Sequence, residues 1–223
     1  MKKISTFLMV SGIVINMAAQ QTFTNFQNAS LVIGQPDFQT QIINLCDSII
    51  YKPSYCAISS KGMLAVASQG HGNVKIWYKL PTVNGQAADV VVGNPDFDTE
   101  DNSVTQSTIA GNCNGVAWSP DGNRLIAGDY WANRILIWNT IPAVNGQPAD
   151  IVVGQTDFTS NITGLSDSTM NQPLAIMVPP DGKLLVADYY NHRVLVWNSL
   201  PTTNGAHADV VIGQQDFFSN TSG

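Results

Sequence analysis

The chain has 223 residues, of which 44% are hydrophobic and 12% are charged. This composition is too apolar for a disordered chain and too polar for a multi-span membrane protein, so we expect a soluble globular protein. Sixteen acidic residues against ten basic ones give a net charge of −6. The only basic cluster, Lys2-Lys3, lies at the N-terminus, so no nucleic-acid partner is expected.

Residues 1–20 have the pattern of a secretory signal peptide. A positive Lys2-Lys3 pair precedes a mostly apolar stretch over 4–17, and Ala18-Ala19-Gln20-Gln21 then supplies small and polar residues. An apolar stretch of about fourteen residues is shorter than the roughly twenty that a spanning helix needs. We therefore expect cleavage near Ala19 or Gln20, no membrane span afterwards, and a secreted, periplasmic or cell-surface protein; a retained membrane anchor is the alternative.

The three cysteines, Cys46, Cys56 and Cys113, form an odd set, so at least one is expected to be unpaired. Cys56 lies in an apolar run, Tyr55-Cys56-Ala57-Ile58, and we expect it to be a small buried residue. The spacing allows a Cys46–Cys113 disulfide but does not demand one. Neither a CxxC motif nor a Cys/His zinc pattern is present, so the sequence predicts no metal and no cofactor.

A unit of about sixty residues repeats along the rest of the chain, and such repeats decide the fold before single elements do. The sequence Leu31-Val32-Ile33-Gly34-Gln35-Pro36-Asp37-Phe38 returns in closely related form near residues 90, 151 and 211. Its glycine recurs at intervals of 59, 61 and 59 residues, at Gly34, Gly93, Gly154 and Gly213. A tryptophan recurs at intervals of 61 and 59 residues, at Trp77, Trp138 and Trp197.

The second copy of this unit contains four segments with strand composition. Turn signals at Asp121-Gly122 and Asn145-Gly146 separate segments that are rich in β-branched and aromatic residues. The four segments are 115–119, 124–129, 134–138 and 149–154. Four short antiparallel strands at a fixed period predict an all-β protein, a β-propeller built of four-stranded antiparallel blades.

Two of the units carry a charged hairpin between their second and third strands. Asp188-Tyr189-Tyr190-Asn191-His192-Arg193 follows an Asp-x-x-Asn-x-Arg pattern, and Asp129-Tyr130-Trp131-Ala132-Asn133-Arg134 departs from it only at Ala132. The first copy, 68–73, has neither charged residue. The hairpins resemble the NHL repeat, and the Gly-Gln-Pro-Asp-Phe element resembles the long-blade NHL-type repeats of exported bacterial proteins. The resemblance covers roughly residues 29–218.

The number of blades predicts a partial ring within residues 21–223. We expect one orphan outer strand at 31–34 and then three blades, at about 53–93, 113–154 and 173–213. NHL-like rings typically have six blades, so the simplest interpretation is that the full product continues with about three more blades beyond Gly223. The alternative is self-association of two half-rings, which would bury the exposed end blades.

The candidate ligand site lies on one face of the predicted disc. The second-to-third strand hairpins and the blade-to-blade connections share that face, and their longer, variable loops make it the expected binding surface. Four aromatic residues and one histidine stand on these hairpins: Tyr130, Trp131, Tyr189, Tyr190 and His192. Neighbouring blades would bring the rings together as a stacking platform for a sugar or a peptide; for His192 a plain surface position is the alternative.

Other repeated residues are expected to be structural. The hairpin ends are predicted to pair within each hairpin: Asp129 with Arg134 and Asp188 with Arg193. The tryptophans are expected to pack between blades: Trp77, Trp138 and Trp197. One aspartate per unit precedes a phenylalanine and is expected to cap a turn, with a calcium role as the alternative: Asp37, Asp96, Asp157 and Asp216.

The sequence offers few groups for catalysis. Some relatives of this architecture are amidating lyases with a histidine-bound metal or lactonase-like hydrolases with an acidic metal site. This chain has one glutamate, Glu100, and three scattered histidines, His71, His192 and His207. We therefore expect a non-catalytic module that binds protein or glycan. The alternatives are a metal-dependent hydrolase or lyase completed by missing blades, and a scaffold within a larger cell-surface protein.

Overall fold

The computed structural model describes residues 27–221. The predicted signal peptide, residues 1–20, lies outside the described residues. Leu31 begins the unit that contains all the assigned strands, whereas the residues up to Ser30 belong to a separate unit. The description below concerns the unit that begins at Leu31.

Within the described residues, the chain forms three four-stranded antiparallel sheets. Blade 1 contains β1 (Pro53–Ile58), β2 (Leu64–Ser68), β3 (Asn73–Trp77) and β4 (Val90–Val92). Blade 2 contains β5 (Cys113–Trp118), β6 (Leu125–Asp129), β7 (Arg134–Trp138) and β8 (Ile151–Val153). Blade 3 contains β9 (Pro173–Met177), β10 (Leu184–Asp188), the short 3-10 helix η1 (Tyr189–Asn191), β11 (Arg193–Trp197) and β12 (Val210–Ile212). The all-β prediction with four-stranded blades is confirmed.

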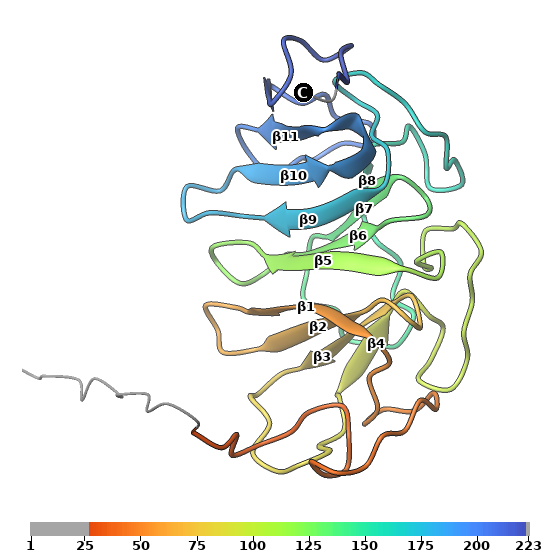
Figure 1. Ribbon diagram of the computed structural model, residues 1–223, viewed down its shortest axis with the longest axis vertical. Helices are drawn as coiled ribbons and strands as arrows, with labels where there is room; N and C mark the ends of the chain where they lie inside the picture. The colour runs from red at the N-terminus through yellow and green to blue at the C-terminus, as the bar shows by residue number, and fades with distance from the viewer. Residues whose placement is uncertain (1–26, 222–223) are drawn as a thin grey trace, which may run out of the picture. The chain divides into compact units, whose positions relative to one another are not determined.

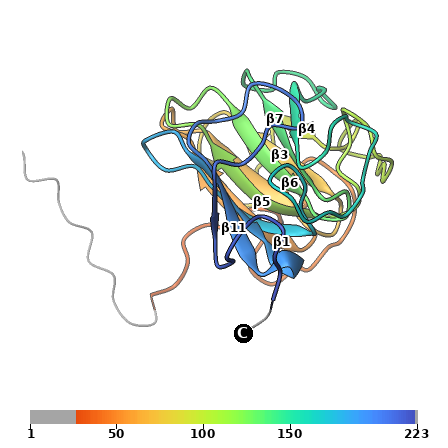
Figure 2. The same cartoon turned by 90° about the horizontal axis from the view of Figure 1, so that it is seen from above.

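The sheets follow one another face to face, with β1, β5 and β9 as neighbouring edge strands (Figures 1 and 2). One core cluster joins Ile76 and Val92 of blade 1 to Leu136 of blade 2, and a second joins Ile137 of blade 2 to Leu195 of blade 3. The interfaces between blades are therefore the hydrophobic cores, and no sheet buries its apolar residues alone.

Burial along the strands reports how many faces of each blade are covered. Every residue of β6 and β7 is buried, because blade 2 has a neighbour on each side. In β10, buried and half-buried residues alternate, as expected for a strand with one covered face. Blade 1 has a neighbouring blade on one side, yet β2 and β3 are buried throughout. Another part of the chain must cover its second face.

The segment before β1 provides that cover (Figure 1). Ile33 and Ile50 pack with Trp77 of blade 1 in a third hydrophobic cluster, and the Ile50 amide donates to the Gly34 carbonyl at 3.1 Å. Gly34 has a φ of +84°, and a Cβ there would lie 2.8 Å from the Ile50 side chain, so the turn requires glycine. Within residues 27–221, residues 31–34, expected as an orphan outer strand, belong to none of the three sheets, because no described strand pairs with them.

Cys56 corrects one prediction from the sequence. Its side chain is exposed rather than buried, because it lies on β1, at the edge of blade 1, where the segment before β1 gives only partial cover. Cys46 and Cys113 are also free, so the disulfide that the spacing allowed is not formed. Burial raises the pKa of the Cys113 thiol far above its ordinary value.

Candidate functional site

The loop-rich face is the end of the blades where β2 joins β3, β6 joins β7 and β10 joins β11. In blade 2 its hairpin is held by a fully buried ion pair, in which Arg134 Nε donates to Asp129 Oδ2 at 2.9 Å. The other oxygen, Asp129 Oδ1, accepts from the amides of Ala110 and Ala132 at 3.1 and 3.3 Å. Burial raises the pKa of Asp129, and the Arg134 guanidinium and the two amides oppose that shift.

Arg134 also connects its hairpin to the loops on both sides of the blade. Its Nη2 donates to the carbonyls of Thr105 and Thr108 at 3.0 and 2.9 Å, in the segment that leads into blade 2. Its Nη1 donates to the carbonyl of Phe158, in the segment that leads out. The guanidinium therefore uses its donors on protein oxygens, which suits a structural group.

Blade 3 repeats this arrangement with one added group. Arg193 Nε donates to Asp188 Oδ2 at 2.7 Å, and both side chains are fully buried. Asn191, the residue that blade 2 replaces with Ala132, donates to Asp188 Oδ2 at 2.9 Å and to the Gly164 carbonyl at 2.8 Å. Burial raises the pKa of Asp188, against the bonds from the backbone, Asn191 and Arg193. The two hairpins are thus fixed by the same chemistry.

The fixed hairpins present the aromatic cluster, which we define as Tyr130, Trp131, Tyr189 and Tyr190. Tyr130 and Trp131 meet edge to face with ring centroids 5.0 Å apart, and Tyr189 and Tyr190 do so at 4.9 Å. Burial, and then the neighbouring Tyr190 phenol of blade 3, raise the pKa of Tyr130. The bond from the Gln172 amide to Asn133 Oδ1 holds the blade 2 hairpin beside the start of blade 3. About half of the Trp131, Tyr189 and Tyr190 surfaces remains exposed. The structure therefore brings the four predicted aromatic residues together.

His192 is next to Tyr189 of this cluster: its amide donates to the Tyr189 carbonyl at 3.2 Å, and both residues line one pocket. It adopts a left-handed conformation with a φ of 51°, like Asn133 at the matching place in blade 2 with a φ of 54°. The Asn133 side chain joins its hairpin to blade 3, because its Oδ1 accepts from the Gln172 amide at 2.9 Å. His192 therefore stands at a blade-to-blade position of an end blade, beside an open pocket of about 350 Å³ that includes Ile212.

Blade 1 adds an aromatic residue that the sequence analysis missed. The Tyr51 ring lies against Gly70, where a Cβ would meet it at 2.1 Å, and 5.3 Å from the His71 ring. Lys52 Nζ lies 5.1 Å from the Tyr51 centroid, within cation–π range. Burial lowers the pKa of His71. Tyr51 precedes β1 and does not belong to the hairpin between β2 and β3. Its place beside that hairpin is shown by the Gly70 amide, which donates to the Tyr51 carbonyl at 3.1 Å.

The three repeated tryptophans lie at the opposite ends of the blades. Each donates its indole N–H to a carbonyl nine residues later, at 3.0, 2.8 and 3.0 Å for Trp77, Trp138 and Trp197. Trp138 belongs to the cluster between blades 1 and 2, and Trp197 to the cluster between blades 2 and 3. Trp77 packs under Ile33 and Ile50 instead. None of the three faces the aromatic cluster.

The repeated aspartates cap turns in the segments between blades. Asp157 Oδ1 accepts from the amides of Thr159 and Ser160 at 2.9 and 2.8 Å. Asp37 and Asp96 accept in the same way from the amides two and three residues on, and Asp216 accepts from the Phe218 amide. These bonds lower the carboxyl pKa values. Among residues 27–221, no group of three or more His, Cys, Asp or Glu side chains could hold a metal ion.

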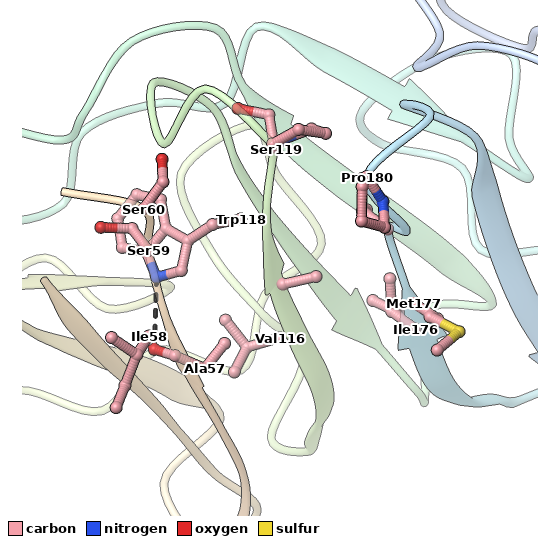
Figure 3. A pocket seen from close by; sticks show the side chains of 13 residues that line it. Ala57, Ile58, Ser59, Ser60, Val116, Trp118, Ser119, Ile176, Met177 and Pro180 are labelled. Carbon is pink, nitrogen blue, oxygen red and sulfur yellow. Dashed lines mark hydrogen bonds between the residues drawn. The ribbon is translucent and has the colours of Figure 1, made fainter. Parts of the chain in front are cut away.

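A pocket of about 450 Å³ lies along the innermost strands (Figure 3). The Trp118 indole N–H donates across it to the Ala57 carbonyl at 3.3 Å, and Ile58 and Met177 are exposed at its edges. Serine hydroxyls are its polar groups, and no titratable side chain lines it. This pocket, which the sequence analysis did not identify, can bind an apolar group but has no residue for acid–base chemistry.

Comparison with known families agrees with this architecture. Residues 170–197, which span β9, β10 and β11, match the NHL repeat. Blade 3 carries an NHL repeat. Residues 103–139 of the propeller, which span β5, β6 and β7, match the WD domain, G-beta repeat. A search of curated proteins found no match. Over the part of the propeller chain that the structure describes, no helix has the length and apolar character to cross a membrane.

Proposed function

We propose that this propeller is a secreted, non-catalytic module that binds a protein or a glycan through its loop-rich face. NHL and WD-type repeats indicate a β-propeller interaction module. The aromatic cluster supports the choice of face, because it is the place where exposed rings from two blades meet. The single observation that carries the proposal is the pair of half-exposed aromatic rings on each of two neighbouring hairpins.

The charge distribution around the cluster indicates how a ligand would be recognised. Asp129, Arg134, Asp188 and Arg193 are buried and bonded to each other and to backbone groups. They are therefore not available to a ligand, which would meet ring faces, phenol hydroxyls and loop backbone. Such a surface favours sugar rings or apolar and aromatic peptide side chains, which gain from stacking without a charged partner.

The hairpins also favour binding by being held in place before a ligand arrives. Rings carried on a loop that is fixed by a buried ion pair and several backbone bonds lose little freedom on association. Preorganised groups keep more of their interaction energy as affinity. This is the role that the buried charges play in the proposal: they position the rings and do not touch the ligand.

The test is a glycan and peptide array followed by titration of each hit. Trp131→Ala and Tyr189→Ala, one from each blade, should each weaken binding at least about fivefold, since one stacked ring contributes on the order of 1–3 kcal/mol. Tyr78→Ala, which removes a partly exposed ring at the opposite ends of the blades, should leave binding unchanged. Equal binding by all three variants and the unaltered chain would show that the ligand uses another surface.

Two measurements test the remaining parts of the proposal. N-terminal sequencing of protein exported by a bacterial host should find a chain that begins near Gln20, and a retained Met1 in that protein would contradict secretion by cleavage. Metal analysis of the purified protein should find no stoichiometric metal. A bound metal at one equivalent would instead favour the hydrolase or lyase reading.

A further inference from the structure

The segment before blade 1 occupies the position of an outer strand. Two outer strands, β4 and β8, each bond through their middle residue to the Asn-Gly turn of the following blade. The Val91 amide donates to Asn145 Oδ1 at 3.0 Å, and the Gly146 amide donates back to the Val91 carbonyl at 3.0 Å. Val152 makes the same two bonds with Asn204 and Gly205, at 3.0 and 2.9 Å.

Val32 makes these two bonds with the turn of blade 1. Its amide donates to Asn84 Oδ1 at 3.1 Å, and the Gly85 amide donates to its carbonyl at 3.1 Å. Leu31–Gly34 therefore stands on blade 1 as the outer strand of a preceding blade would stand. The other three strands of that blade are not among the described residues.

The edge of this segment that would meet those strands is unpaired. In blade 1 the residues on either side of Val91 pair with β3, Val90 with Ile76 and Val92 with Val74. Leu31 and Ile33 hold the matching places, and within residues 27–221 neither makes a backbone hydrogen bond. Unpaired N–H and C=O groups along an extended segment are a template for another strand.

One strand of the chain, β11, already pairs with a segment whose sequence closely resembles that of Leu31–Gly34. In blade 3, β11 pairs with β12, Val196 with Val210 and Val194 with Ile212. Residues 29–38 and 208–217 are identical at seven of ten positions, including the Val-Ile-Gly-Gln run. The edge of β11 is thus matched in its side chains to Leu31–Gly34 as well as to its own β12.

Both end faces of the unit are apolar, and each is only partly covered. On blade 1 a pocket of about 370 Å³ is lined by Ile33, Ile50, Leu64 and Val66. On blade 3, Val210 and Ile212 are 43% and 53% exposed. The backbone at the start of blade 1 is also shaped like that of blade 3, which follows another blade: Lys52 has a φ of 51° and Gln172 one of 54°.

We propose that a second copy of this chain docks on the partly covered end face of blade 1. Blade 3 of one copy packs against blade 1 of the other, and Leu31–Gly34 pairs with β11 of the partner in place of Val210–Ile212. The contact is reciprocal and two-fold symmetric, so each copy supplies both surfaces to the other. Exchanging near-identical strands leaves the pairing unchanged, so burial of the two end faces favours the dimer. This inference does not depend on the ligand of the loop-rich face.

The test is the mass of the protein in solution, by light scattering after gel filtration and by sedimentation over a range of concentrations. We expect twice the 24.0 kDa of one chain, less any cleaved leader. Leu31→Pro should give a folded monomer, because proline removes an N–H that is unused within one copy and needed at the seam. Circular dichroism should show the same strand content as the unaltered chain.

Val210→Pro is the matched control at the same place in β12. It should keep the dimer, because Leu31–Gly34 replaces β12 on β11 in the exchanged arrangement. A monomer at every concentration would mean that another partner covers blade 1, and it would overturn the proposal. So would a dimer that Leu31→Pro leaves intact, or one that Val210→Pro disrupts instead.

Discussion

The hairpin of blade 1 and those of blades 2 and 3 share a backbone path but differ in chemistry. Blades 2 and 3 bury an Asp and an Arg in the hairpin, and each charge has several partners. Blade 1 has Ser68 and Asn73 at those places, and Ser68 Oγ donates to the Tyr51 carbonyl at 2.7 Å. The side-chain amide of Asn73 and Lys75 Nζ are buried and, within the described residues, have no hydrogen-bond partner.

Blade 1 lacks both members of the charged pair rather than one of them. A buried Arg without its Asp, or the reverse, would leave an uncompensated charge, which costs far more than losing both. With both absent, the fold of blade 1 persists on apolar packing and on the segment before β1. The Asp–Arg pair is thus a device for holding loops, and the sheet itself forms without it.

The largest expected effect comes from breaking one pair. Arg134→Met should lower the free energy of unfolding by about 3–5 kcal/mol, because it leaves the Asp129 carboxylate buried without its cation and frees three loop carbonyls. Urea denaturation measures this. Asn73→Ala at the matching place in blade 1 should cost less than about 1 kcal/mol, since the Asn73 amide has no partner to lose. Equal losses at both sites would contradict the comparison.

The second prediction concerns Lys75, which stands in blade 1 where blades 2 and 3 have Leu136 and Leu195. Burial lowers the pKa of Lys75 to about 8. Lys75→Leu should therefore raise the free energy of unfolding at pH 7 by about 2 kcal/mol, by removing a buried charge without a hydrogen-bond partner. The midpoint temperature of thermal unfolding should rise by several degrees. Lys79→Leu, at an exposed position, should change that temperature little.

The sign of the pH dependence gives a check on Lys75. Its folded pKa lies below the value of 10.5 for a free lysine, so between about pH 8 and 10.5 the unfolded chain binds more protons than the folded one. The contribution of Lys75 to stability therefore rises with pH across that window. The difference in stability between Lys75→Leu and the unaltered chain should shrink over the same range, and a constant difference would contradict a buried charged amine.

The smallest expected effect concerns a feature that all blades share. The pKa of Asp157 is lowered, first by the backbone bond from Thr159, and the pKa of Asp37 is lowered, first by that from Gln39. Carboxyl NMR titration should place both below the ordinary value of 3.8. The stabilisation they provide is present above that pH and lost as the pH falls through the folded values. If the titration midpoint of Asp37 alone were ordinary, the segment before blade 1 would differ from the segments between the other blades, as the hairpin of blade 1 already does.

The repeat made most of the fold predictable, because a period near sixty residues and four strand-like segments per unit leave few architectures. The aromatic cluster followed from the same register, since equivalent hairpins of adjacent blades lie side by side. The features at the first and last blades could not be predicted from the repeat. The exposure of Cys56 and the position of Leu31–Gly34 depend on which blade faces have a neighbour. The contact of Tyr51 with the hairpin of blade 1 depends on the residues just before β1, and the repeat pattern does not mark those residues.

The reach of Arg134 bears on how the molecule comes apart. One guanidinium binds carbonyls in the loop that enters its blade and in the loop that leaves it, so melting of blade 2 releases the connections to both neighbours at once. A stacked array held only by nearest-neighbour packing would unravel unit by unit from either end. In blades 2 and 3 these arginine bonds tie each hairpin to the loops on both sides, and blade 1, where Asn73 makes no such bonds, should release its loops first.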